Sequence, residues 1–153
     1  MRTVAMICFL MNVSLHLPAQ QPMQYLKNKA SISGVAIQLN DDAPNANPAS
    51  MSRASFKVVE GKTYKGQMPV STVLTDDKGN FHLELAPGVY SIVEKDRPEV
   101  FATRKNTATE KWDNRCLKKL WQTPLLVVTV TSLENKTIEV RTPSSSHNPC
   151  LKK

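Results

Sequence analysis

Two cysteines and a histidine near the C-terminus are the residues best suited to nucleophilic chemistry. His147 lies shortly before Cys150, and Cys116 precedes both. A thiolate enzyme requires a free cysteine with a lowered pKa and a base that is held in place beside it. In an exported chain the two cysteines instead bond to each other, and His147 then decorates a surface loop. We therefore expect no catalytic cysteine.

Metal binding would have to draw on His82, His147, Asp76, Asp77 and the cysteines. The sequence contains no Cys-x-x-Cys pair and no His-x-x-x-His pair. The run Asp76–Gly79 resembles the start of a calcium loop, but the remaining ligands and the distal glutamate are absent. A capped turn accounts for these aspartates better. The sequence predicts no metal site and no cofactor.

Cations and tryptophans gather between residues 97 and 121. Side chains of this kind bind nucleic acids, anionic glycans or lipid head groups through charge and stacking. The candidate binding surface consists of Lys105, Lys111, Trp112, Arg115, Lys118, Lys119 and Trp121. The alternative is that Trp121 joins the core and the lysines form a solvated helix face, since tryptophans are mostly buried.

The first twenty residues have the order of a secretory signal peptide. Arg2 precedes an apolar run from Val4 to Leu17, and the small residue Ala19 stands before a polar stretch. The alternative is a buried N-terminal strand or helix. The run is shorter than a membrane-spanning helix, and no later segment approaches that length. We expect a signal peptide over 1–20, no transmembrane span, and export to the periplasm or cell surface, where nucleic acid is not a partner.

Cleavage of this peptide would remove Cys8 and leave Cys116 and Cys150 as a pair. An even number of cysteines in an exported chain predicts a disulfide. Closing a loop of this length would stabilise the fold by about 3.5–4 kcal/mol. The bond would also tie down the polar tail, residues 143–153.

Length and charge limit the remaining possibilities. The chain has 153 residues, enough for one domain, and 41% of them are hydrophobic, which is typical of a globular protein. Twenty Lys and Arg residues against 13 Asp and Glu residues give a formal charge of +7. This balance favours anionic partners but does not determine the fold.

Alternating apolar residues between turn signals predict about seven strands. They cover residues 31–39, 54–59, 70–75, 81–85, 89–94, 125–131 and 137–141, with a further strand at 99–103. In the first strand we expect Val35, Ile37 and Leu39 to share one face. The run 125–131 is apolar on both faces and predicts a central strand, with which 137–141 pairs back.

Two turns and one helix complete the expected elements. Asp76–Gly79 and Ala86–Gly88 have the composition of hairpin turns. Residues 109–121 predict a short helix because Cys116, Leu117, Leu120 and Trp121 recur at helical spacing, with Thr109 as N-cap and Pro124 as the stop.

Together these elements predict an all-β fold. We expect an antiparallel two-sheet Greek-key sandwich, transthyretin-like or immunoglobulin-like, over residues 31–142, preceded by a flexible lead-in at 21–30. The short helix falls near the C-terminal third. The expected core contains Phe81, Leu83, Tyr90, Ile92, Val128 and Val130.

The segment 75–93 resembles the central motif of carboxypeptidase regulatory-like, or transthyretin-like, β-sandwich domains of the bacterial envelope. The match consists of a Thr-Asp turn, a glycine, an aromatic-led strand and a Pro-Gly-x-Tyr entry to the next strand. The matching residues are Thr75, Asp76, Gly79, Phe81, Leu83, Leu85, Pro87, Gly88, Tyr90 and Ile92, and Ile32-x-Gly34 looks like the family's first strand. The resemblance implies a non-catalytic module. Relatives that hydrolyse 5-hydroxyisourate end in Tyr-Arg-Gly-Ser, which is absent here.

The sequence thus favours an exported binding module that contacts an envelope protein or an anionic glycan and has no enzymatic activity. The alternative is a structural module that stabilises another envelope component and has no ligand pocket. An enzyme of unrecognised type is the least favoured reading.

Overall fold

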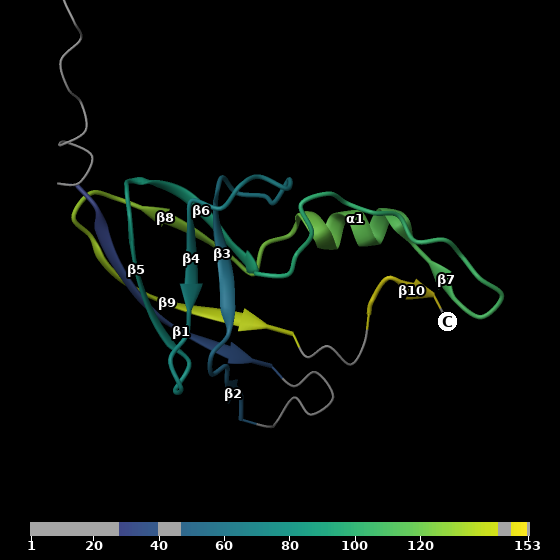
Figure 1. Cartoon of the computed structure of the whole chain (residues 1–153), viewed down its shortest axis with the longest axis horizontal. Helices are drawn as coiled ribbons and strands as arrows, with labels where there is room; N and C mark the ends of the chain where they lie inside the picture. Colours follow the sequence, from purple (N-terminus) through teal and green to yellow (C-terminus); the bar gives the residue numbers. More distant parts are fainter. Residues whose placement is uncertain (1–27, 40–46, 144–147, 153) are drawn as a thin grey trace, which may run out of the picture.

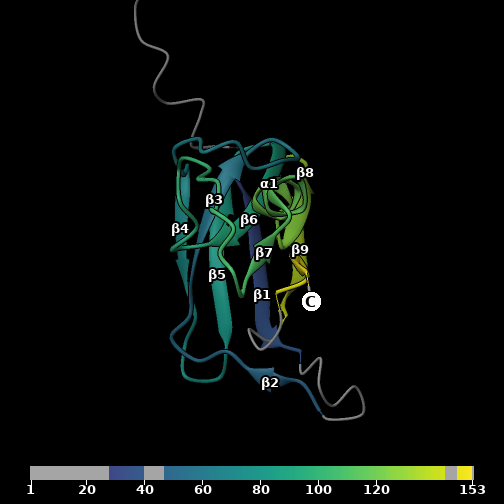
Figure 2. The same cartoon turned by 90° about the vertical axis from the view of Figure 1, so that its right-hand side faces the viewer.

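Two four-stranded sheets pack face to face (Figures 1 and 2). The computed structural model describes residues 28–39, 47–143 and 148–152. The expected signal peptide, most of the lead-in at 21–30 and His147 lie outside the described residues.

The first sheet is built around strand β1 (Ala30–Gln38). On one side β1 pairs with β9 (Asn135–Thr142), and on the other with β5 (Asn80–Leu85) and the short β2 (Ala49–Ser50). The β1–β9 pair is parallel and sets Gly34 opposite Ile138, whereas the pairs with β5 and β2 are antiparallel.

The second sheet has the order β4-β3-β6-β8 and is antiparallel throughout. Its strands are β3 (Ser55–Glu60), β4 (Ser71–Leu74), β6 (Gly88–Glu94) and β8 (Leu126–Val130). The predicted two-sheet, mainly antiparallel sandwich is confirmed. Helix α1 (Asn114–Gln122) and the small sheet of β7 (Lys111–Trp112) with β10 (Leu151–Lys152) lie beyond one end of it (Figure 1).

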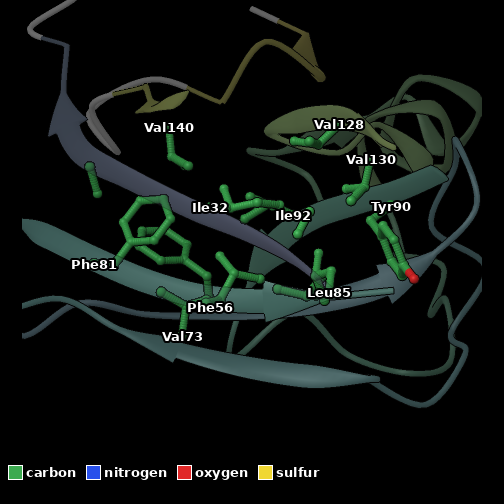
Figure 3. Close-up of a cluster of buried hydrophobic side chains, with 14 residues drawn as sticks. Ile32, Phe56, Val73, Phe81, Leu85, Tyr90, Ile92, Val128, Val130 and Val140 are labelled. Atoms are coloured by element: carbon green, nitrogen blue, oxygen red, sulfur yellow. The ribbon is translucent and has the colours of Figure 1, made fainter. Parts of the chain in front are cut away.

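The inner faces of the two sheets form the hydrophobic core (Figure 3). The predicted core residues are all buried: Phe81, Leu83, Tyr90, Ile92, Val128 and Val130. The Phe81 ring packs directly over Gly34, where a side chain would collide with it: a Cβ added there would lie 2.4 Å from Phe81 Cζ.

The outer face of the second sheet is covered as well. Val59, Tyr64 and Val93 are fully buried there, and Trp121 of α1 packs against them. This second cluster attaches the helix to the sandwich.

The two predicted hairpin turns are turns, but they do not connect hydrogen-bonded neighbours. Asp76–Gly79 leads from β4 in one sheet to β5 in the other, and the turn before Gly88 leads back from β5 to β6. The local turn chemistry is as expected, since Asp76 Oδ1 accepts from the amides of Lys78 and Asn80 at 2.8 Å each. Gly79 has a φ of 83°.

Other predictions about pairing were wrong. β8 is an edge strand, and β9 pairs with β1 in the opposite sheet instead of returning to β8. On β1 the buried residues are Ala30, Ile32 and Ala36. Val35, Ile37 and Leu39, which were predicted to share one face, alternate with this buried set and are half-buried.

Residues 99–103 form no strand. Phe101 instead packs against the Trp121 ring, with 5.8 Å between the ring centroids. This segment therefore covers the helix rather than extending a sheet.

Candidate binding surface

The N-cap of helix α1 is Asp113 rather than the predicted Thr109. Asp113 Oδ1 accepts from the amides of Arg115 at 3.0 Å and Cys116 at 3.1 Å. These bonds, the one from Cys116 first, hold the pKa of the Asp113 carboxyl below its usual value. Thr109 lies in a turn in which the Glu110 amide donates to Thr107 Oγ1. Lys111 and Trp112 form β7, so the helix cannot begin earlier.

The helix has one apolar side and one basic side, as its residue spacing predicts. Cys116, Leu117, Leu120 and Trp121 share the apolar side. Trp121 meets the Tyr64 ring edge-on at 5.3 Å, and its Nε1 donates to the Pro98 carbonyl at 2.8 Å. Trp121 is thus a packing residue, as the alternative interpretation held.

The predicted disulfide is present. Cys116 and Cys150 are bonded, with 5.4 Å between their Cα atoms and 34 positions between them in the sequence. The Asp113 amide also donates to the Cys150 carbonyl at 3.0 Å, and Leu151 pairs with Trp112. The described part of the tail, residues 148–152, is therefore fastened to the start of the helix.

A groove of about 570 Å³ runs between α1 and the segment 94–104. Its apolar lining residues are Pro98, Phe101, Leu117, Leu120, Trp121 and Pro143. Leu120 remains 44% exposed, so this apolar wall is open to solvent. The charged side chains along the groove are Glu94, Asp96, Arg97 and Arg104.

Arg97 holds the groove together. Its guanidinium donates to the carbonyls of Trp121, at 3.0 Å, and Thr123, and forms an ion pair with Glu94 at 2.5 Å. Its side chain is only 10% exposed. These contacts anchor the C-terminal end of α1, so Arg97 has a structural role.

Arg104 lies over the ring of Trp112, with 4.5 Å between Cζ and the ring centroid. Its backbone is fixed because the Arg104 amide donates to Asn114 Oδ1 at 2.8 Å and Asn114 Nδ2 donates back to the Arg104 carbonyl at 3.0 Å. Trp112 Nε1 donates to Glu110 Oε2 at 3.1 Å. This stack joins a cation to an aromatic face at the rim of the groove.

The predicted surface residues separate into three groups. Arg115, Lys118 and Lys119 are exposed on the basic side of α1, and Lys105 and Lys111 are exposed before it. Trp112 is half-buried beneath Arg104, and only Trp121 of the predicted set lines the groove. The sequence interpretation counted Arg104 among the cations of residues 97–121 but left it out of the candidate surface, and it did not predict the groove.

Within the described residues, no cluster of three or more His, Cys, Asp or Glu side chains is placed to hold a metal ion. No helix in that part of the chain is long and apolar enough to cross a membrane.

Neither a protein-family model nor a curated protein sequence matches the chain. Several solved structures share its general architecture at low similarity. One is the shaft pilin spaA from Lactobacillus rhamnosus GG, with 11% identity and a TM-score of 0.46 over 78% of this chain and 52% of the pilin.

Two further structures have lower TM-scores. The Bacillus anthracis TIE protein has 14% identity and a TM-score of 0.41 over 76% of this chain and 17% of its own. A DUF3823 family protein from Parabacteroides merdae has 13% identity and a TM-score of 0.39 over 74% and 45%. The chain spans from about a sixth to about half of the length of these three proteins.

Proposed function

We propose that this chain is an exported, non-catalytic β-sandwich module that binds an anionic glycan of the cell envelope beside helix α1. The Arg104–Trp112 stack at the rim of the groove is the observation that carries the proposal. A sugar ring can stack on apolar and aromatic surface in the groove, while the guanidinium pairs with a carboxylate or phosphate on the same glycan.

Three other features support this assignment. Arg115, Lys118 and Lys119 extend positive charge along the exposed side of the helix. The disulfide and the β7–β10 pair fix the helix, which lowers the entropy lost on binding. The resemblance of residues 75–93 to carboxypeptidase regulatory-like domains is consistent with a module that binds without catalysis. An acidic envelope protein could occupy the same surface.

The experiment compares binding of three variants to an array of envelope glycans and to detergent-solubilised envelope proteins. The first variant, Arg104→Ala with Trp112→Ala, removes the stack, and the second, Arg115→Ala with Lys118→Ala and Lys119→Ala, removes the basic side of α1. The control, Lys62→Ala with Lys78→Ala and Arg141→Ala, removes three exposed cations elsewhere.

We expect the control to bind like the native chain and the first variant to lose its glycans. The second variant should bind more weakly, mainly at low salt, because exposed charges are screened over about 10 Å at 0.1 M salt and about 3 Å at 1 M. If the first variant and the control retain the same partners with equal affinity, the glycan site is elsewhere or absent. The chain would then be a structural module.

A further inference from the structure

Strand β4 is an edge strand, and within the described residues no strand pairs with its outward side. The Thr75 amide donates to the Ala54 carbonyl, which fixes the alternation along the β3–β4 ladder. In an antiparallel pair alternate residues direct both backbone groups to the same neighbour. Ser71 and Val73 therefore bond to β3, and the amides and carbonyls of Thr72 and Leu74 point away from the sheet.

The segment around β4 is uncharged and unusually apolar for an exposed edge. Residues 66–75 contain no Asp, Glu, Lys or Arg in a chain that carries +7 overall. The exposed fractions of Met68, Val70 and Leu74 are 75%, 53% and 67%. Proteins normally protect such edges with charges, prolines or covering side chains.

The opposite edge of the same sheet is protected in this way. On β8 the Thr129 carbonyl accepts from Lys136 Nζ at 3.0 Å. Just beyond the strand, the Thr131 amide donates to Glu134 Oε2 at 3.2 Å. Glu134 of the β8–β9 turn and Lys136 of β9 thus occupy positions that an added strand would need.

The outer strands of the other sheet are protected too. β9 carries Lys136, Glu139 and Arg141. On β5 both backbone groups of Asn80 are already bonded to Asp76, and the following exposed residues are polar or charged. As far as the described part of the chain shows, β4 is the one of these four outer strands with neither a charge nor a covering side chain.

We propose that β4 is a self-association edge, where two copies of the chain join their β4 strands antiparallel about a twofold axis near Val73. Thr72 of each copy then pairs with Leu74 of the other, so all the outward amides and carbonyls of both residues find partners. The exposed side chains of Val70 and Leu74 from both copies form one apolar strip on the outer face.

A second copy is a suitable partner for this edge because the edge is neutral. The segment 66–75 carries no charge in a chain of +7, so two copies can join here without bringing like charges together between the paired residues. A strongly basic partner would not match this edge, because its charges would face a neutral strip.

The test measures dimer dissociation by sedimentation equilibrium of the purified protein. Thr72→Pro removes an outward amide, which an edge strand tolerates in the monomer, but which the dimer needs. We expect its dissociation constant to rise at least about tenfold. Val127→Pro is the matched control, because the Val127 amide points outward on the protected β8 edge of the same sheet. It should leave the dissociation constant unchanged, and circular dichroism should show both variants folded.

Cross-linking tests the register without depending on a proline. Hydrogen-bonded antiparallel partners have Cα atoms about 5.5 Å apart, within the range of a disulfide. An equimolar mixture of Thr72→Cys and Leu74→Cys chains should oxidise to mixed dimers in higher yield than either variant alone. A native chain that stays monomeric at millimolar concentration overturns the proposal. So does a dimer that Thr72→Pro and Val127→Pro weaken equally, or cross-linking that shows no preference for the mixture.

Discussion

At the scale of single residues, Gly34 shows how one missing side chain determines the packing of the sandwich. It lies on the central strand β1, where a Cβ would lie 2.4 Å from Phe81 Cζ and 2.8 Å from the Ile138 carbonyl oxygen. The ring of one neighbouring strand and the backbone of the other therefore both depend on the absence of a side chain at this position.

Replacing Gly34 by Ala should lower the free energy of unfolding by about 1–3 kcal/mol, because the Phe81 ring or β9 must shift. Urea denaturation measures this change. Ser33→Ala, on the exposed side of the same strand, is the control and should change stability by less than about 0.5 kcal/mol. Equal stability of the two variants would show that the ring is not confined at this point.

The packing at Gly34 also explains why the sequence identifies the buried face of β5 but not that of β1. On β5, Phe81, Leu83 and Leu85 alternate with polar residues, so the period of two identifies the buried face. On β1 only Ile32 is large among the buried residues, beside Ala30 and Ala36, and Val35 and Ile37 lie on the other side. Residue size misleads here because Phe81 of the neighbouring strand fills the space.

At the scale of elements, the sequence located all seven main strands but not their partners. The Asp76 turn forms through bonds between residues close in sequence, so its presence is predictable. Whether such a turn joins two neighbours of one sheet or crosses to the other sheet depends on distant strands. β8 was expected to be central because it is apolar on both faces, yet it is an edge whose outward groups Glu134 and Lys136 partly cover.

The helix and the tail depend on the disulfide in the same non-local way. Reduction should release the C-terminal strand and speed hydrogen exchange at the Asp113 amide, which bonds to the Cys150 carbonyl. The cross-link stabilises a loop of this size by about 3.5–4 kcal/mol in the chain-entropy model. The control is the Gly61 amide, which donates to the Val89 carbonyl of β6. Its hydrogen-exchange rate should change much less. Equal acceleration at both amides would mean that the helix does not open separately from the sandwich.

At the scale of the whole molecule, charge was readable from the sequence, whereas the groove was not. The basic residues of the 97–121 segment are visible in composition alone, but which of them meet an aromatic ring is decided by folding. Arg97 became an anchor for α1, and Arg104 became the partner of Trp112. The apolar walls of the groove come from segments that no local pattern connects.

Export itself is open to a direct measurement. We expect the protein recovered from the producing cells to lack about the first twenty residues, since Arg2 and the following apolar run have the order of a signal peptide. Intact-mass spectrometry under non-reducing conditions tests this and should also show no free thiol. Recovery of Met1 or Cys8 in the native protein would contradict it.

The parallel pairing of β1 with β9 has a consequence for the order of events in time. Gly34 and Ile138 are neighbours in the sheet although almost the whole domain separates them along the chain. One side of β1, the first strand of the domain, therefore has no partner strand until β9, the last main strand, has formed. Contacts so distant in sequence are associated with folding over about milliseconds to seconds. A chain that emerges N-terminus first, in synthesis or export, can complete this sheet only after Thr142, the last residue of β9, has emerged.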